Sequence, residues 1–198
     1  LADGLGRWIG WTDAIPLAAA LQAPLKPGKG AAPAGPADSA CALAALESEL
    51  ARMRALLVRA IDDDGETAAD ADFAGHRRRC MALQQAMAAD VAALRAQART
   101  AVAQCSPALG RLAALDAVLG KALGPREQAL LAMMPTLLER HFERLRQAAA
   151  VGDDAGAAAP PGAAWLQDFR RDMKQLLLAE LELRLQPVQG LIDALRGP

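Results

Sequence analysis

His141 is the residue whose surroundings most resemble a catalytic or metal-binding site, because acids stand two positions away on either side, at Glu139 and Glu143. Residues two apart on a helix point to different faces, so neither carboxylate is expected beside the imidazole. The Glu-x-x-His pair of carboxylate metal sites in helical bundles would need an acid at position 138, which is Leu138. His141 is therefore predicted to lie at the margin of a buried helix face, without a catalytic role.

The run HRRRC supplies a second candidate, with His76 and Cys80 four residues apart. On a helix this pair shares one face and makes half of a zinc site, since zinc takes nitrogen and thiolate ligands in sets of four. Cys41 or Cys105 would have to complete the set from elsewhere in the fold, and the spacing demands neither, so no metal is predicted. The arginines between are Arg77, Arg78 and Arg79. They are interpreted as a solvated face, as partners of the acidic run Asp62–Asp72 across the turn, or as a docking point for an anion or an acidic partner.

Other motifs of enzymes and ion sites do not fit this sequence. The run DDDGET resembles a calcium loop, but with Gly65 in the sixth position the first and twelfth positions are Ala60 and Ala71, where acids are required. Glycine motifs for phosphate binding or for a nucleophile elbow do not occur. The chain offers few members for a hydrolytic triad. We therefore predict no catalytic residue, no cofactor and no enzyme activity.

Composition favours helices and a setting inside the cell. The 198 residues are 53% hydrophobic but only 3% aromatic, and they are rich in alanine, leucine and arginine. A net charge of −1, with acids and bases interspersed, argues against nucleic acid as a partner. Three cysteines without a C-x-x-C pair are typical of a reducing cytoplasm. The longest uncharged stretches fall short of the ~20 apolar residues of a membrane span.

Apolar periodicity predicts an all-α fold, an antiparallel bundle of five to six amphipathic helices, some of them long, in a single domain over 1–198. Two linkers rich in Pro, Gly and Ala interrupt it, at about 23–39 and 150–163. Asp38 or Ser39 is expected to cap the second helix, and Ser106-Pro107 to begin the fourth. Gly124-Pro125 is expected to separate the fourth helix from the fifth. The helices are predicted at about 1–22, 40–61, 73–104, 107–123, 125–149 and 164–196.

Two surfaces are predicted to meet a partner. The last helix carries an apolar stripe too wide for one monomer to cover, so a homo-oligomer or a helical partner protein is expected on residues such as Leu178 and Leu183. Trp8 and Trp11 are expected to pack in the core or on a partner, since their segment holds few of the basic residues of interfacial helices. Met133 and Met134 are expected to fill the core.

Several stretches together resemble a proteobacterial family of all-helical proteins catalogued as a domain of unknown function. They are RWIGWTDAIPLAAAL, MALQQAM, LDAVLGKALGPREQALLAMMPTLLERHFERLRQ and WLQDFRRDMKQLLLAELELRLQPVQGLIDALRG, and they cover most of the chain outside the two linkers. Members of that family have further residues before the Trp segment, so a truncated N-terminus is expected. The resemblance implies no activity and transfers no catalytic residue.

The function expected from these observations is that of a non-catalytic cytoplasmic helical scaffold or adaptor acting through protein–protein contacts. The alternative is an accessory subunit of a membrane-associated complex of cell-envelope or motor-like type, peripheral rather than spanning, which the resemblance and the two tryptophans favour. A third alternative is a ligand- or metal-binding bundle built around His141 or His76.

Overall fold

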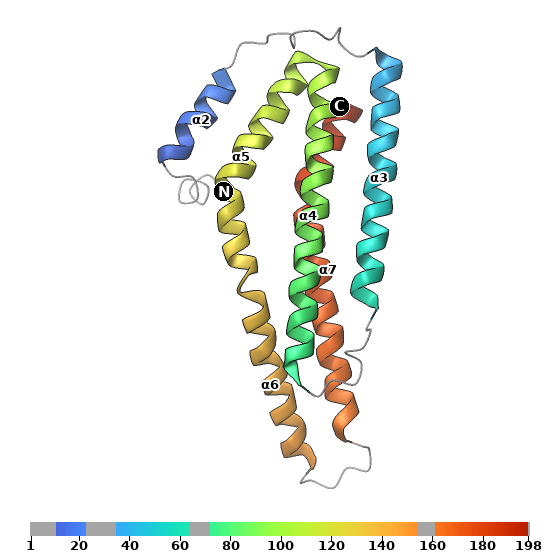
Figure 1. The fold of residues 1–198 in the computed structure, drawn as a ribbon, viewed down its shortest axis with the longest axis vertical. Helices are drawn as coiled ribbons and strands as arrows, with labels where there is room; N and C mark the ends of the chain where they lie inside the picture. The colour runs from blue at the N-terminus through green and yellow to red at the C-terminus, as the bar shows by residue number, and fades with distance from the viewer. Residues whose placement is uncertain (1–10, 23–34, 64–71, 154–160, 198) are drawn as a thin grey trace. The chain divides into compact units, whose positions relative to one another are not determined.

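The computed structural model describes residues 11–22, 35–63, 72–153 and 161–197, which form helices and short turns (Figure 1). The prediction of an all-α fold is confirmed. None of the helices in these ranges is both long and apolar enough to cross a membrane. The helices are α2 (Trp11–Gln22), α3 (Pro36–Asp62), α4 (Phe73–Cys105), α5 (Pro107–Leu131), α6 (Met134–Asp153) and α7 (Pro161–Arg196).

The chain forms two compact units, and the boundaries between them fall inside helices. Unit 1 consists of Leu1–Met53, Asp90–Ala129 and Leu185–Pro198, and unit 2 of Arg54–Ala89 and Leu130–Arg184. Helices α3, α4, α5 and α7 each contribute residues to both units. Unit 2 holds the three phenylalanines and both histidines of the chain.

Helix α3 begins four residues earlier than predicted, because half of a capping box forms at Gly35. The Gly35 amide donates to Asp38 Oδ2 (3.2 Å), and the Ser39 amide donates to the Gly35 carbonyl (3.0 Å). Asp38 therefore acts from the third helical position, and Gly35 occupies the capping position, with Pro36 first in the helix. The expectation that Asp38 or Ser39 itself occupies the capping position was wrong.

Helix α5 begins as Ser106-Pro107 predicts. The Leu109 amide donates to Ser106 Oγ (3.2 Å), which satisfies one of the amides that a helix start leaves without an intrahelical acceptor.

Replacing this cap should destabilise the protein measurably. Ser106→Ala is expected to lower the free energy of unfolding by about 1 kcal/mol, because the Leu109 amide loses its acceptor. Urea unfolding followed by circular dichroism measures the change. Ser48→Ala, an exposed serine within α3, is the matched control and should change stability by less than about 0.5 kcal/mol. Equal losses in the two variants would contradict the capping role.

The break between α5 and α6 lies at residues 132–133 rather than at Gly124-Pro125, which α5 runs through. The Gln84 side chain of α4 explains this position, because its amide donates to the Leu131 carbonyl (3.1 Å) and so gives the last residue of α5 a partner. Pro135 then stands in the first turn of α6, where its missing N–H costs little. Met134 is buried but Met133 is exposed, so the prediction that both fill the core was wrong for Met133.

Unit 1 combines a small apolar core with an ion-pair network between α4 and α5. Arg95 and Arg99 both bind Asp116, with Nη2–Oδ1 and Nε–Oδ2 distances of 2.5 and 2.7 Å, and Asp116 is largely shielded from solvent. Arg196, near the end of α7, binds Glu47 of α3 at 2.7 Å. The buried apolar residues of unit 1 are Leu46, Met53, Val91, Leu94, Ala98, Val102, Ala113, Leu185, Val188, Leu191 and Ile192.

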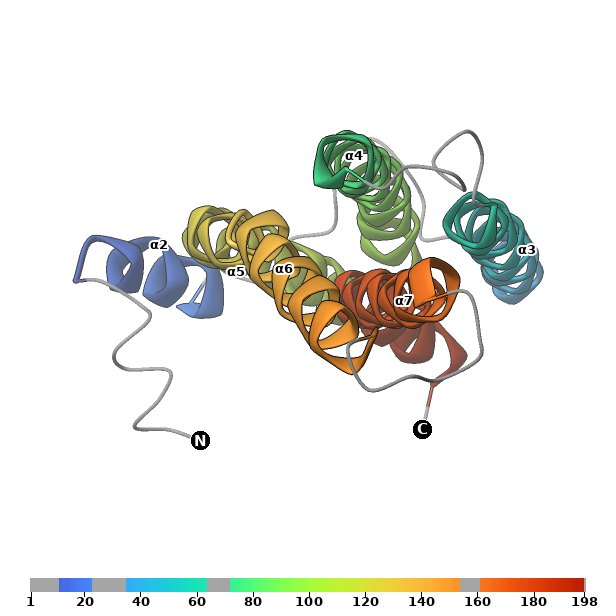
Figure 2. The same ribbon diagram turned by 90° about the horizontal axis from the view of Figure 1, so that it is seen from below.

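Unit 2 is built where α4, α6 and α7 converge, with α3 packed alongside. Figures 1 and 2 show α6 and α7 side by side. Two contacts fix their antiparallel register: His141 bonds Asp172, and Gln84 reaches both Met134 and Glu180. Met134 lies seven residues before His141 on α6, and Glu180 lies eight residues after Asp172 on α7. The two helices therefore keep nearly the same register between these two contacts. The buried apolar residues are Leu57, Ile61, Phe73, Cys80, Leu83, Met87, Met134, Leu138, Phe142, Leu166, Phe169, Met173, Leu177 and Leu181.

The predicted linkers are shorter than expected within the described residues. Helix α6 continues to Asp153 and α7 starts at Pro161, so both enter the range assigned to the second linker. Residues 1–10, which were predicted to open the first helix, lie outside the described residues, as do 23–34 and 154–160.

Candidate functional site

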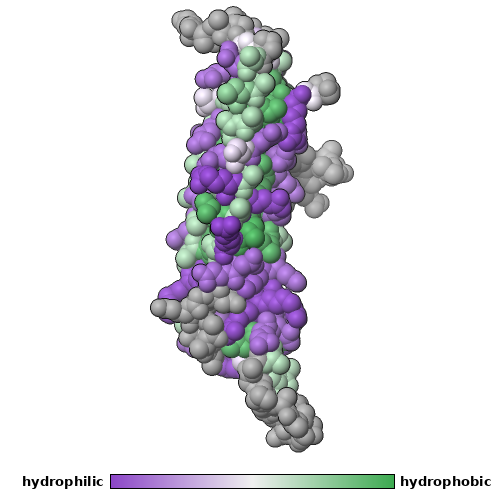
Figure 3. Space-filling view, turned by 90° about the vertical axis from the view of Figure 1, so that its right-hand side faces the viewer, coloured by the Kyte–Doolittle hydropathy of each residue, from purple (hydrophilic) through white to green (hydrophobic). Residues whose placement is uncertain are grey.

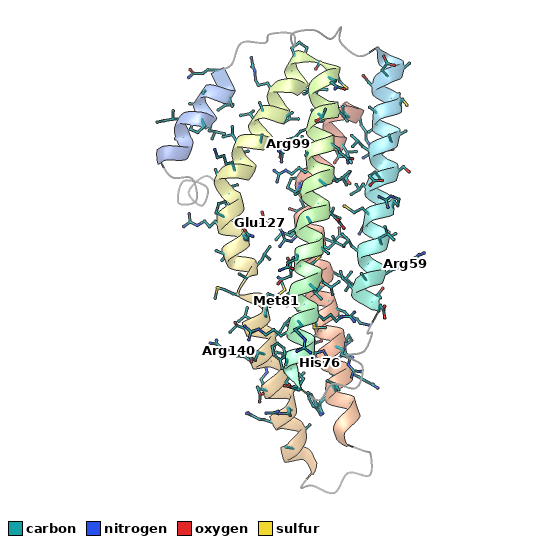
Figure 4. All side chains as sticks on the ribbon, viewed as in Figure 1. Arg59, His76, Met81, Arg99, Glu127 and Arg140 are labelled. Carbon is teal, nitrogen blue, oxygen red and sulfur yellow. The ribbon has the colours of Figure 1, made fainter. Side chains whose placement is uncertain are left out.

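A line of polar side chains runs through the interior of unit 2 along one face of α4. It consists of His76, Cys80 and Gln84, whose spacing of four places them on successive turns. His76 and Cys80 are fully buried (0% exposed), and His76 lies on the first turns of α4 (Figure 4). His76 and Cys80 therefore share one face of α4, as predicted.

Glu180 of α7 completes this line as a buried carboxylate with each oxygen bonded. Gln84 Nε2 donates to Oε2 (2.9 Å), while Arg184 donates to Oε1 from Nε (2.8 Å) and Nη2 (2.7 Å). The Glu180 side chain has no solvent exposure, so the Arg184 guanidinium and the Gln84 amide replace the water that the charge would otherwise require. The carboxylate thus links α7 to α4 through Gln84, and it bonds Arg184 one turn further along α7.

His76 lies among aromatic rings. Its centroid is 5.2 Å from that of Phe169 in an edge-on arrangement and 5.9 Å from that of Phe142. Phe73 and Trp165 extend the cluster, with centroids 5.6 and 5.1 Å from Phe142. Offset and edge-on pairs at these distances stabilise a core beyond the apolar area they bury. His76 is accordingly a packed core residue.

His141 is half-buried at the edge of the contact between α6 and α7, as predicted for a boundary histidine. Its Nε2 lies 2.8 Å from Asp172 Oδ2, and its Nδ1 lies 2.7 Å from Nη2 of Arg144. Because guanidinium only donates, Nδ1 accepts and Nε2 carries the proton that bonds Asp172. Both ring nitrogens are used in bonds within unit 2. Sequence reasoning missed Asp172 as the partner, because it lies 31 residues away.

Across the described ranges, no group of three or more His, Cys, Asp or Glu side chains is placed to hold a metal ion. The pair of His76 and Cys80 therefore meets no further ligands there. Cys41, Cys80 and Cys105 are all free thiols.

Burial raises the pKa of the Cys80 thiol from its ordinary 9.0 to about 11, and the negative charge of Glu180 adds to the shift. The thiolate is the reactive form, so Cys80 is inert near neutral pH. Cys41 is exposed on α3, so a reagent can reach its thiol.

Thiol labelling should separate these two cysteines. At pH 8 iodoacetamide is expected to modify Cys41 within minutes and to leave Cys80 unmodified until urea unfolds the protein, because burial excludes both thiolate and reagent. Peptide mass spectrometry over time measures this. Equal labelling rates of Cys41 and Cys80 in the folded protein would contradict the burial of Cys80.

The free energy of unfolding should also fall between about pH 9 and pH 11. In that range the unfolded chain has released the Cys80 proton while the folded protein retains it.

The three arginines Arg77, Arg78 and Arg79 lie in different environments. Arg77 and Arg78 are exposed, whereas Arg79 is half-buried and its Nη2 donates to the carbonyls of Ala60 and Ile61 (both 3.1 Å). Together with Lys174 Nζ, which donates to the Asp62 carbonyl (2.8 Å), Arg79 caps the end of α3. The interpretation of Arg79 as part of a solvated face was therefore wrong.

The other predicted partner residues are separated as well. Leu183 is exposed and Leu178 is half-buried on α7. Trp8 lies outside the described residues, and Trp11 begins α2. A role of these residues in binding stays a prediction.

Exposed apolar side chains gather on one side of unit 2. Leu137 lies one turn from His141, and Leu176 lies one turn from Asp172, so the antiparallel register places both at one level. Ala179 and Leu183 continue the row on α7, while Met133 in the turn before α6 and Leu130 in the last turn of α5 lie before Leu137 in the chain. We call this set of six the α6/α7 apolar face. Its large side chains are 37–58% exposed: Leu130, Met133, Leu137, Leu176 and Leu183.

The solvent face of α3 differs from the α6/α7 apolar face. There Arg52, Arg54 and Arg59 alternate with exposed alanines, and Figure 3, which views the side where α3 lies, shows hydrophilic and hydrophobic residues interspersed. Leu56, which is 51% exposed, is a large apolar residue among these charges. Single exposed leucines of this kind are ordinary on protein surfaces.

The fold and this interior define a class of protein: an all-helical chain with a carboxylate, a thiol and an imidazole buried between its helices. A family model, described as a protein of unknown function (DUF3348), matches residues 1–197, and the chain belongs to that family. No curated protein and no solved structure matches it significantly.

Proposed function

We propose that this protein is a non-catalytic helical scaffold or adaptor that acts through protein–protein contacts on the α6/α7 apolar face. The observation that carries the proposal is the grouping of five large, half-exposed apolar side chains in two adjacent rows. Fully burying a Leu or Met contributes about 1.5–3 kcal/mol, so covering these half-exposed residues would contribute about 5 kcal/mol. Apolar surfaces of this kind on otherwise charged proteins mark interaction sites.

The interior of unit 2 supports the non-catalytic part of this proposal. Glu180 is bonded through both oxygens, His141 through both ring nitrogens, and the raised pKa of Cys80 keeps its thiol protonated. Groups engaged in this way stabilise the helices that present the apolar face. The proposal places the protein in the cytoplasm, where three free thiols are compatible with the redox conditions.

Copurification of the full-length protein from its native cells tests the proposed function. The wild type is compared with Leu137→Glu/Leu176→Glu, which places two charges in the face, and with Leu56→Glu, a matched change at an exposed leucine of α3. We expect the double variant to lose proteins that the wild type and Leu56→Glu both retain, with equal unfolding free energies in all three. The same set of proteins with all three, or none above background when untagged copies of the protein itself are counted among those recovered, would overturn the proposal.

A further inference from the structure

We propose that the occupant of the α6/α7 apolar face is a second copy of this chain, with α6 of each copy packed against α7 of the other. The inference rests on the proposed function and names the partner. In such a dimer a two-fold axis runs parallel to the helices within the interface, and each copy contributes the same surface.

The apolar rows are complementary under this operation. One row consists of Leu130 at the end of α5, Met133 in the turn before α6 and Leu137 of α6, and the row of α7 beside it is Leu183, Ala179 and Leu176. Leucines of one copy therefore meet leucines of the other at both ends. Between them, the exposed Met133 of one copy lies over the small Ala179 of the other, so a large side chain meets a space that fits it.

The charges next to these rows are complementary in the same way. Beyond Leu137, α6 presents the exposed Arg140 and Arg144, and Arg140 points outward from the helix (Figure 4). Beyond Leu176, α7 presents Asp172 and Asp168, which bind His141 and Arg171 within the same copy and whose side chains are still 39% and 50% exposed. The register brings Arg144 of one copy to the level of Asp168 of the other, and the two-fold axis makes this contact twice. A single copy thus carries both halves of a self-complementary surface.

Burial also favours a second copy. The same five large apolar side chains are covered in each copy, so one association covers ten. The half-exposed pair of His141 and Asp172, with its 2.8 Å bond, becomes shielded at the edge of the apolar rows. The result is a bundle of four helices from two chains, an arrangement in which apolar rows of adjacent helices face one another.

Sedimentation equilibrium of the full-length protein tests the dimer. We expect the wild type to be dimeric at micromolar concentration, and Leu137→Glu/Leu176→Glu to be monomeric with unchanged helix content. Leu56→Glu should remain dimeric. A wild type that is monomeric at every concentration, or a dimer that the double variant retains, would overturn the inference.

Two charge variants test the orientation independently of the apolar residues. Arg144→Glu alone and Asp168→Arg alone each place like charges across both symmetric contacts, so each should weaken self-association at least tenfold. An equimolar mixture of the two should recover wild-type affinity, because the mixed dimer pairs Glu with Arg at one contact and Arg with Asp at the other. Neither variant chain carries the compensating substitution itself, so recovery on mixing requires contact between the two different chains. A mixture as weak as its components would overturn the arrangement.

These outcomes also separate the inference from the proposed function. A monomeric wild type whose double variant still loses a different copurified protein refutes the second copy and leaves the adaptor role standing. A dimer that persists in the double variant, together with unchanged copurification, refutes both.

Discussion

Phe142→Ala is expected to lower the free energy of unfolding by about 3–5 kcal/mol, the cost of removing a large aromatic side chain from a packed core. Phe142 is fully buried and its ring centroid lies 5.0–5.9 Å from three others, those of Phe169, Trp165 and Phe73, and from the His76 ring. The remaining rings belong to α4 and α7, so the cavity would be lined by two helices that cannot both close on it. Urea unfolding followed by far-ultraviolet circular dichroism measures the loss.

Two companion variants make this result specific. Phe142→Leu keeps much of the side-chain volume and should cost clearly less than the alanine variant. Leu56→Ala removes a comparable apolar side chain from an exposed site in the same unit and should stay within about 0.5 kcal/mol of wild type. A Phe142→Ala loss no larger than that of Leu56→Ala would show that the aromatic cluster does not stabilise unit 2.

The helices were predictable because local chemistry places them. The apolar spacing of Leu46, Met53 and Leu57 indicated the buried side of α3, and Ser106-Pro107 fixed the start of α5. Gly124-Pro125 misled, since a strong local stop signal was outweighed by a partner distant in sequence. That partner is Gln84, which satisfies the carbonyl of Leu131, and side-chain caps of this kind become visible only once the helices are packed.

The candidate site was predictable in part. The spacing of four placed His76 and Cys80 on one face, and the neighbours of His141 indicated a boundary position. The burial of Glu180 was missed, although this residue falls three positions after Leu177 on the buried side of α7, where a charged residue is unusual. The pairings of His141 with Asp172 and of Arg79 with the end of α3 depend on helix register, which periodicity alone does not specify.

The buried carboxylate gives the second large effect. Glu180→Ala is expected to cost about 3–5 kcal/mol, because it leaves the largely buried Arg184 guanidinium without its counter-charge and removes an acceptor from Gln84. Glu182→Ala is the matched control, two residues along α7. Glu182 also binds an arginine, Arg54 at 2.5 Å, but both side chains are more than half exposed, so its loss should cost no more than about 1 kcal/mol.

A double-mutant cycle with Arg184 separates two explanations for that cost. If the penalty arises from a buried charge without its partner, Glu180→Leu/Arg184→Leu should be more stable than Glu180→Leu alone, because the second substitution removes the charge that the first one strands. If the pair itself supplied most of the stability, the second substitution would bring no recovery. Gln84 keeps the Leu131 carbonyl as an acceptor in every variant, so the end of α5 remains capped throughout the cycle. Measured unfolding free energies in which the double variant is less stable than either single variant would exclude the first explanation, and Glu180 would then contribute to stability directly rather than by specifying how α7 meets α4.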